Sequence, residues 1–215
     1  MLETYFNITG IFEWLSFTAS LIFLNKKTGL WQLFKIFLLI ILIIESIGWY
    51  AHYILQKNNN WIFNILMLMT LPFFVLLFSS QPMAIKNKKS LLVIVSFFLF
   101  TIINFIWGEG FWDYIKYTSV FGHIILAAIA CYFLMNIFKE EDSRDLFRYE
   151  YFWLANGLLL YCLGNIVLYL FLNALRAYYQ ETYINIYVKI NGAINVLFYS
   201  SLIIAFICRH KATKL

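Results

Sequence analysis

The stretch LFKIFLLIILIIESIGWYAHYIL, residues 33–55, decides the fold class. Its apolar side chains follow one another without alternation, and its only charged side chains are Lys35 near the start and Glu45. A bilayer core about 30 Å thick is crossed by about 20 helical residues, whereas a membrane strand alternates between apolar and polar positions. This stretch therefore predicts a transmembrane helix.

Similar runs cover most of the chain on both sides of this stretch. The 215 residues are 63% hydrophobic and 13% charged, against roughly 45–50% and 25% in soluble domains. We expect one all-α domain over residues 1–215, a polytopic integral membrane protein that is a seven-transmembrane-helix bundle. The predicted spans are 8–24, 33–55, 61–79, 91–107, 117–138, 151–173 and 185–208.

The basic residues favour one set of loops. Twelve of the sixteen Lys and Arg lie after the first, third and fifth spans, at the start of the second, and in the C-terminal tail. The other four are Lys57, Lys116, Arg176 and Lys189. Cytoplasmic loops carry an excess of Lys and Arg. The pattern predicts an N-terminus outside and a C-terminus in the cytoplasm, in a bacterial inner membrane, and it gives no sign of nucleic-acid binding.

Polar side chains within the spans lie mostly toward the outside in this orientation, which predicts an outward-facing polar pocket. Glu45 lies near the middle of its span, where a carboxyl group is expensive and a functional role is the default. Trp49 and His52 follow it on the same helix face. The candidate ligand-binding residues are Glu45, Glu13, Trp49, His52, His123, Asn165, Lys189, Asn191 and Asn195.

Structural alternatives exist for several of these residues. Each Asn is more simply explained as a hydrogen-bonding partner of a neighbouring helix. Trp49 and His52 are explained equally well as members of the belt of aromatic side chains at the membrane interface. Lys189 is explained as a side chain that extends outward to the membrane surface or that pairs with an acidic residue. A retinal-binding role for Lys189 is disfavoured because it lies too close to the outer end and the third span has no acidic counter-ion.

Chemical motifs are scarce, and we expect no cofactor, no bound metal and no catalytic residue. Only His52 and His123 lie within spans, without the spacing of zinc-binding motifs. The most charged loop, residues 139–150, is the first candidate for contact with a cytoplasmic or membrane signalling partner. Its candidate contact residues are Lys139, Arg144, Asp145 and Arg148.

Several short motifs resemble those of a group of short, uncharacterised seven-helix proteins of Bacteroidetes. The resemblance covers residues 31–208. It rests on the motifs IESIG at 44–48, NWIFNI at 60–65, FW at 152–153, GLLLY at 157–161, Asn191 with Asn195 and Tyr199, and FIC at 206–208. It implies a sensor or accessory protein, some relatives being encoded near signalling kinases, and it implies no catalytic residues. The layout is also similar, more weakly, to carriers of the SWEET and PnuC kind.

The expected function is therefore that of a receptor-like sensor or accessory protein, without enzymatic activity, embedded in the lipid bilayer. It would bind a small or lipidic ligand and signal through its short cytoplasmic loops. The alternatives are a small-solute transporter with a 3+1+3 arrangement of spans and an intramembrane metal-dependent hydrolase.

Overall fold

The computed structural model describes residues 8–24, 26–80, 87–139 and 145–214, with the backbone alone for residues 26–28 and 87. Its described part consists of helices joined by short connections and contains no strand. The elements are α2 (Ile8–Phe23), η1 (Lys26–Gln32), α3 (Leu33–Tyr53), α4 (Asn60–Ser79), α5 (Asn87–Trp107), α6 (Lys116–Lys139), η2 (Leu146–Arg148), α7 (Glu150–Leu170), α8 (Leu172–Thr182) and α9 (Ile186–Ala212). The all-α prediction is confirmed.

Six helices are long and apolar enough to cross a membrane: α3, α4, α5, α6, α7 and α9. Each begins and ends within a few residues of a predicted span, because the apolar run sets the length of the helix. The described part of α2 has 16 residues, which corresponds to about 24 Å of helix. The described residues thus form an all-helical bundle, compatible with a membrane protein, with six helices of spanning length and one shorter apolar helix.

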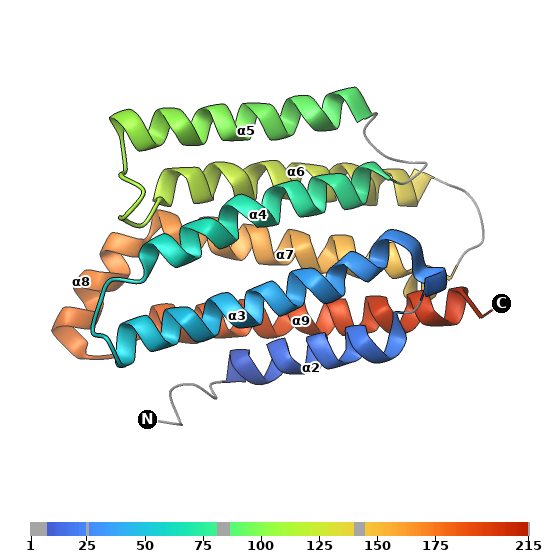
Figure 1. The fold of residues 1–215 in the computed structure, drawn as a ribbon, viewed down its shortest axis with the longest axis horizontal. Coiled ribbons are helices and arrows are strands. Elements are labelled where there is room, and N and C mark those ends of the chain that lie inside the picture. The colour runs from blue at the N-terminus through green and yellow to red at the C-terminus, as the bar shows by residue number, and fades with distance from the viewer. Residues whose placement is uncertain (1–7, 25, 81–86, 140–144, 215) are drawn as a thin grey trace.

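The long helices run side by side (Figure 1). Helix α9 packs against α7 and α2, α6 packs against α7, and α5 lies at the edge of the bundle against α4 and α6. Helix α8, which the sequence analysis did not predict, follows α7 directly and lies at one end of the bundle. Its left-handed cap at Tyr183, with φ of 57°, turns the chain into α9.

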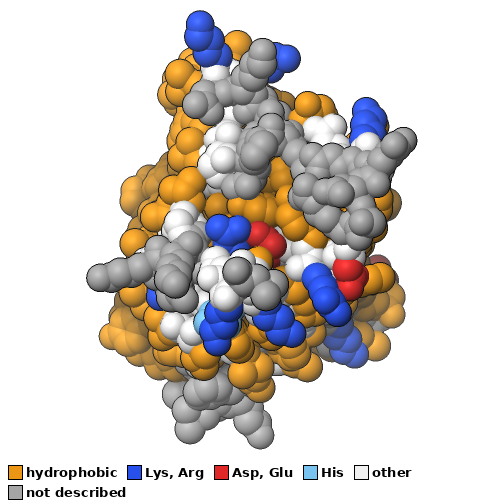
Figure 2. All heavy atoms as spheres, turned by 90° about the vertical axis from the view of Figure 1, so that its right-hand side faces the viewer, with side chains coloured by type: hydrophobic (Ala, Val, Ile, Leu, Met, Phe, Trp, Pro, Cys, Tyr) orange, Lys and Arg blue, Asp and Glu red, His pale blue; other side chains and the backbone are white. Residues whose placement is uncertain are grey.

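We call the end where α2, α4, α6 and α9 finish the basic end. Figure 2 looks onto this face and shows basic side chains gathered on it. Those that the structure describes there are Lys35, Lys88, Lys89, Lys139, Arg148, Arg209, Lys211 and Lys214. We call the opposite end, which carries Lys57, Lys116, Arg176 and Lys189, the α8 end. Of the other residues used to predict the orientation, Lys86 and Arg144 lie outside the described residues, as do the side chains of Lys26 and Lys27.

Aromatic side chains fill the bundle near the basic end. Gly29 has φ of 62°, a left-handed backbone conformation that suits glycine, and the turn after it returns Trp31 to the interior. The Trp31 Nε1–H donates a hydrogen bond to the Tyr151 hydroxyl over 2.8 Å. Phe206 packs edge to face against this indole and against Phe34, and the Phe34 ring packs against the indole at a tilt of 38°. We call Trp31, Phe34, Phe74, Tyr151 and Phe206 the aromatic cluster.

Candidate functional site

A cavity of about 720 Å³ lies between α3, α4, α6, α7, α8 and α9. The half-buried Asn59 of the α3–α4 loop and the exposed Arg176 and Gln180 of α8 line its mouth at the α8 end. Phe74 of the aromatic cluster and the buried Phe198 line it on the side toward the basic end. Its volume falls within the range typical of small-molecule sites. The cavity therefore opens away from the basic end.

Five of the nine predicted ligand-binding residues line this cavity. They are Glu45 on α3, His123 on α6, Asn165 on α7, and Asn191 with Asn195 on α9. Four helices that are distant in sequence bring these side chains together. Their convergence is a property of the packing, and it selects a subset of the predicted residues.

Glu13 lies beside this group without lining the cavity. Its side chain is buried, with 6% of its surface exposed, on the face of α2 that packs against the bundle. It interacts electrostatically with Glu45 and lies within hydrogen-bonding range of the Tyr199 hydroxyl. The predicted acids of the first two spans thus form a neighbouring pair.

Three predicted residues lie away from the cavity. His52 is exposed on the last turn of α3, where its ring contacts Tyr53, and Lys189 is exposed on α9. Trp49 is half-buried on α3 with its ring against Tyr53. The start of α4 lies against α3 at Gly48, where the Asn59 Nδ2 donates a hydrogen bond to the Gly48 carbonyl over 3.0 Å. The cavity therefore meets α3 no further along than Glu45.

The buried His123 has a defined hydrogen-bonding pattern. Its Nδ1 lies 2.6 Å from the Ser119 carbonyl oxygen, and a carbonyl only accepts, so Nδ1 is the donor. In the neutral imidazole this leaves Nε2 as an acceptor. The ring lies between those of Tyr161 and Tyr169, with centroids 5.6 and 5.5 Å away. His123 thus offers an acceptor among aromatic rings.

The cavity asparagines bond within their own helices. The Asn165 Nδ2 donates to the Tyr161 carbonyl over 2.9 Å, and the Asn195 Nδ2 donates to the Asn191 carbonyl over 2.8 Å. Among the described residues, no group donates a hydrogen bond to the Oδ1 of Asn165 or Asn195. Neither side chain joins two helices, so the interhelical role weighed from the sequence does not describe them.

Tyrosines form much of the remaining lining and were missed by the sequence analysis. Tyr161, Asn165 and Tyr169 repeat every four residues on α7, and Tyr187, Asn191, Asn195 and Tyr199 do the same on α9. Residues four apart share a helix face, so this spacing is a signal that could have identified both polar stripes.

Two parts of the mouth were also missed. Leu172, Leu175, Arg176 and Tyr179 of α8 line the cavity, at the i, i+3, i+4, i+7 spacing of an amphipathic helix. Tyr114, in the loop between α5 and α6, lines it as well. Burial raises the pKa of the Tyr114 hydroxyl well above its usual range, and the nearby Tyr169 and Tyr187 hydroxyls act in the same direction. Tyr114 therefore stays neutral and able to donate a hydrogen bond.

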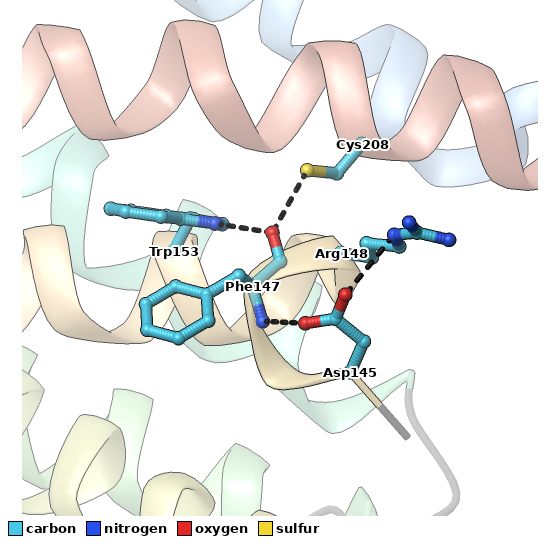
Figure 3. A network of polar contacts seen from close by, with 5 residues as sticks. All are labelled: Asp145, Phe147, Arg148, Trp153 and Cys208. Atoms are coloured by element: carbon cyan, nitrogen blue, oxygen red, sulfur yellow. Dashed lines mark hydrogen bonds and ion pairs between the residues drawn. The ribbon is translucent and has the colours of Figure 1, made fainter.

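The predicted partner loop lies at the basic end. Lys139 is exposed at the end of α6, and Arg144 lies outside the described residues. The Asp145 carboxylate pairs with Arg148 over 3.1 Å and accepts a hydrogen bond from the Phe147 N–H, which caps η2 (Figure 3). Asp145 and Arg148 thus lie on an exposed, locally ordered turn, and Lys139 lies at the end of α6.

This turn is attached to both α7 and α9. The Phe147 carbonyl accepts hydrogen bonds from the Trp153 Nε1–H over 2.9 Å and from the Cys208 thiol over 3.6 Å (Figure 3). One turn further along the chain, Glu150 accepts a hydrogen bond from Arg209 over 2.8 Å. The position of η2 is therefore set by the first turns of α7 and the C-terminal part of α9 together.

The described part of the chain contains no group of three or more His, Cys, Asp or Glu residues placed to hold a metal ion. These described residues do not bring His52, His123 and an acid together, which the hydrolase alternative requires. No family model, curated protein or solved structure matches this chain. The resemblances to Bacteroidetes seven-helix proteins and to carriers stay predictions.

Proposed function

We propose that this protein is a receptor-like membrane protein with seven spans, its N-terminus outside and its C-terminus in the cytoplasm, which binds a small or lipidic ligand in its cavity. The observation that carries the proposal is the cavity of about 720 Å³, which opens at the end opposite the basic one. Because basic residues favour the cytoplasmic side, the mouth of the cavity faces outward.

A route from the cavity to the cytoplasmic side supports a sensing role. Asn191, Asn195 and Tyr199 of α9 line the cavity, and Arg209 on the same helix pairs with Glu150 beside η2. A helix transmits a small shift along its length because its backbone hydrogen bonds hold it rigid. Ligand binding at one end of α9 would then move the exposed turn at the other.

The aromatic cluster favours sensing over transport. Its side chains are buried, and it occupies the bundle between the cavity and the basic end. A carrier has to open its midplane site to both sides in turn. Here the closed side is filled by interlocking rings, which resist rearrangement because packed interiors have few alternative arrangements.

Substituted-cysteine labelling tests the outward cavity. In a background with Cys131, Cys162 and Cys208 replaced by alanine, Asn195→Cys is exposed to a membrane-impermeant thiosulfonate added to intact cells. We expect modification at this position. Leu197→Cys, on the exposed face of the same helix and so toward lipid, should stay unmodified. If Asn195→Cys is labelled in inside-out vesicles but not in intact cells, the proposed orientation of the protein in the membrane is wrong.

The coupling has its own readout. Hydrogen exchange of residues 145–150 is compared before and after modification of Asn195→Cys, with Leu197→Cys treated with a permeant reagent as the control. We expect altered protection around η2 when the cavity is filled. Identical exchange in the modified and unmodified protein would overturn the sensing role and leave a binding cavity without output.

A further inference from the structure

An acidic side chain lies deep in the cavity and a basic side chain lies at its mouth. Glu45 lines it, and Glu13 lies behind Glu45 close enough for the two carboxyl groups to interact. The one basic side chain among the described lining residues is Arg176, which is exposed on α8. Two neighbouring carboxylates repel each other, and a bound cation or a shared proton relieves that repulsion.

Several hydrogen-bond acceptors in the cavity that Glu45 lines have no donor among the described residues. Among the described residues, no group donates a hydrogen bond to its carboxyl oxygens. The Asn165 and Asn195 amide hydrogens are used within their own helices, which leaves the two Oδ1 atoms as acceptors, and His123 adds its Nε2. A ligand that satisfies these groups has to donate hydrogen bonds.

Aromatic rings form the walls around these acceptors. Tyr161 and Phe198 contact each other with ring centroids 4.7 Å apart, and Phe198 contacts Tyr199 at 5.4 Å. The face of an aromatic ring attracts a cation, more strongly where water is excluded. A bare metal ion is a poor fit, because the described residues provide no cluster of three His, Cys, Asp or Glu ligands.

We infer that the cavity binds a protonated organic amine, with the ammonium group at Glu45 and the carbon skeleton against the tyrosine and phenylalanine rings. This inference rests on the proposed function and names the ligand class of the same site. A free amine and an aminophospholipid headgroup share this chemistry. The experiment below separates the two sources.

Charge-selective labelling of the cavity is the test. In the alanine background, Asn195→Cys is reacted with a cationic reagent, trimethylammonium-ethyl methanethiosulfonate, and separately with an anionic one, sulfonato-ethyl methanethiosulfonate. Each reaction rate is divided by the rate of the same reagent at Tyr183→Cys, a position exposed at the same end. A change in thiol reactivity affects both reagents alike, so the ratio of the rates reports charge. We expect a preference for the cation of roughly tenfold or more, as in other focused clefts.

Substitution of the acid gives the matched control. Glu45→Gln should reduce the preference to near the value at Tyr183→Cys, and Glu45→Asp should retain most of it. A cation-to-anion ratio at Asn195→Cys equal to that at Tyr183→Cys overturns the inference. If Asn195→Cys reacts with neither reagent from outside, the outward cavity itself is wrong, which separates the two failures.

Protection identifies the source of the amine. Phenethylamine should slow labelling of Asn195→Cys, and its neutral isostere 2-phenylethanol should not. If phenethylamine has no effect but labelling slows in nanodiscs when phosphatidylethanolamine replaces part of the phosphatidylcholine, the amine is a lipid headgroup. Charge selectivity without protection by either amine overturns the ligand class.

Discussion

The two halves of the bundle are built from the same helices and filled differently. Near the basic end, α9 contributes Leu202, Ala205 and Phe206, each without exposed surface. Near the α8 end, the same helix contributes Asn191 and Asn195 to the cavity. Tight packing in one half supplies stability, which leaves the other half free to carry polar groups that add little to it. We expect large effects from substitutions in the first half and small ones in the second.

Trp31→Ala should give the largest loss. It removes the indole at the centre of the aromatic cluster and its hydrogen bond to Tyr151. Removing a buried aromatic side chain lowers the free energy of unfolding by about 3–5 kcal/mol. The measurement is denaturant unfolding in detergent micelles. Trp107→Ala, at a position 79% exposed, is the control and should change little. Equal losses at the two positions would contradict the comparison.

Glu150→Gln should have the next largest effect, because it removes the charge that Arg209 contacts over 2.8 Å beneath the aromatic cluster. Losing a hydrogen bond between charged groups lowers the free energy of unfolding by roughly 1.5–3 kcal/mol. Asp145→Asn breaks the exposed pair with Arg148 instead, and should lose about 1 kcal/mol or less. A larger loss of unfolding free energy for Asp145→Asn than for Glu150→Gln would show that burial does not decide which ion pair contributes more to stability.

Gly157→Ala tests how closely α7 and α9 pack in the same half. A Cβ at this position would meet the Ser201 Cβ at 2.5 Å and its Oγ at 2.9 Å. Overpacking of this kind lowers the free energy of unfolding by about 1–3 kcal/mol. Adding Ser201→Gly should restore most of the loss. Gly110→Ala, with no neighbouring atom closer than 3.8 Å, is the matched control.

Asn195→Ala should have the smallest effect on stability. Its amide bonds only to Asn191 on its own helix, and polar pairs within membrane bundles contribute about 1 kcal/mol or less. Thermal unfolding of the purified protein measures the change, with Leu202→Ala on the packed stretch of α9 for comparison. A loss as large as that of Leu202→Ala would mean that the polar lining is structural, and the contrast between the halves would fail.

Much of the fold is readable from the sequence because membrane helices follow composition. The predicted span 33–55 becomes α3 at Leu33–Tyr53, and the other long helices begin and end within four residues of their predicted spans. Helix α8 was missed because its 11 residues are too short and too polar for a span. The turn at Gly29, which returns Trp31 to the interior, could not be predicted from the spacing of apolar residues.

The candidate site was predicted only in part for a physical reason. Depth along a helix can be counted from the sequence, and Glu45 and His123, which this count places toward the polar region, both line the cavity. Rotation of a helix about its own axis is set by its neighbours, and this rotation decided that Asn195 lines the cavity and Lys189 does not. His52 shares a predicted face with Glu45, yet it is exposed on the last turn of α3, and Asn59 and Phe63 pack against Gly48 in the stretch between the two.

The sequence by itself determined that this chain forms apolar helices that suit a bilayer, because the cost of burying polar backbone and charge in hydrocarbon acts on each segment separately. It also placed most of the basic residues at one end. The tertiary structure alone decided that Glu13 lies beside Glu45, that tyrosines surround them, and that aromatic rings close the bundle below. These features depend on contacts between helices, and no single segment encodes a contact.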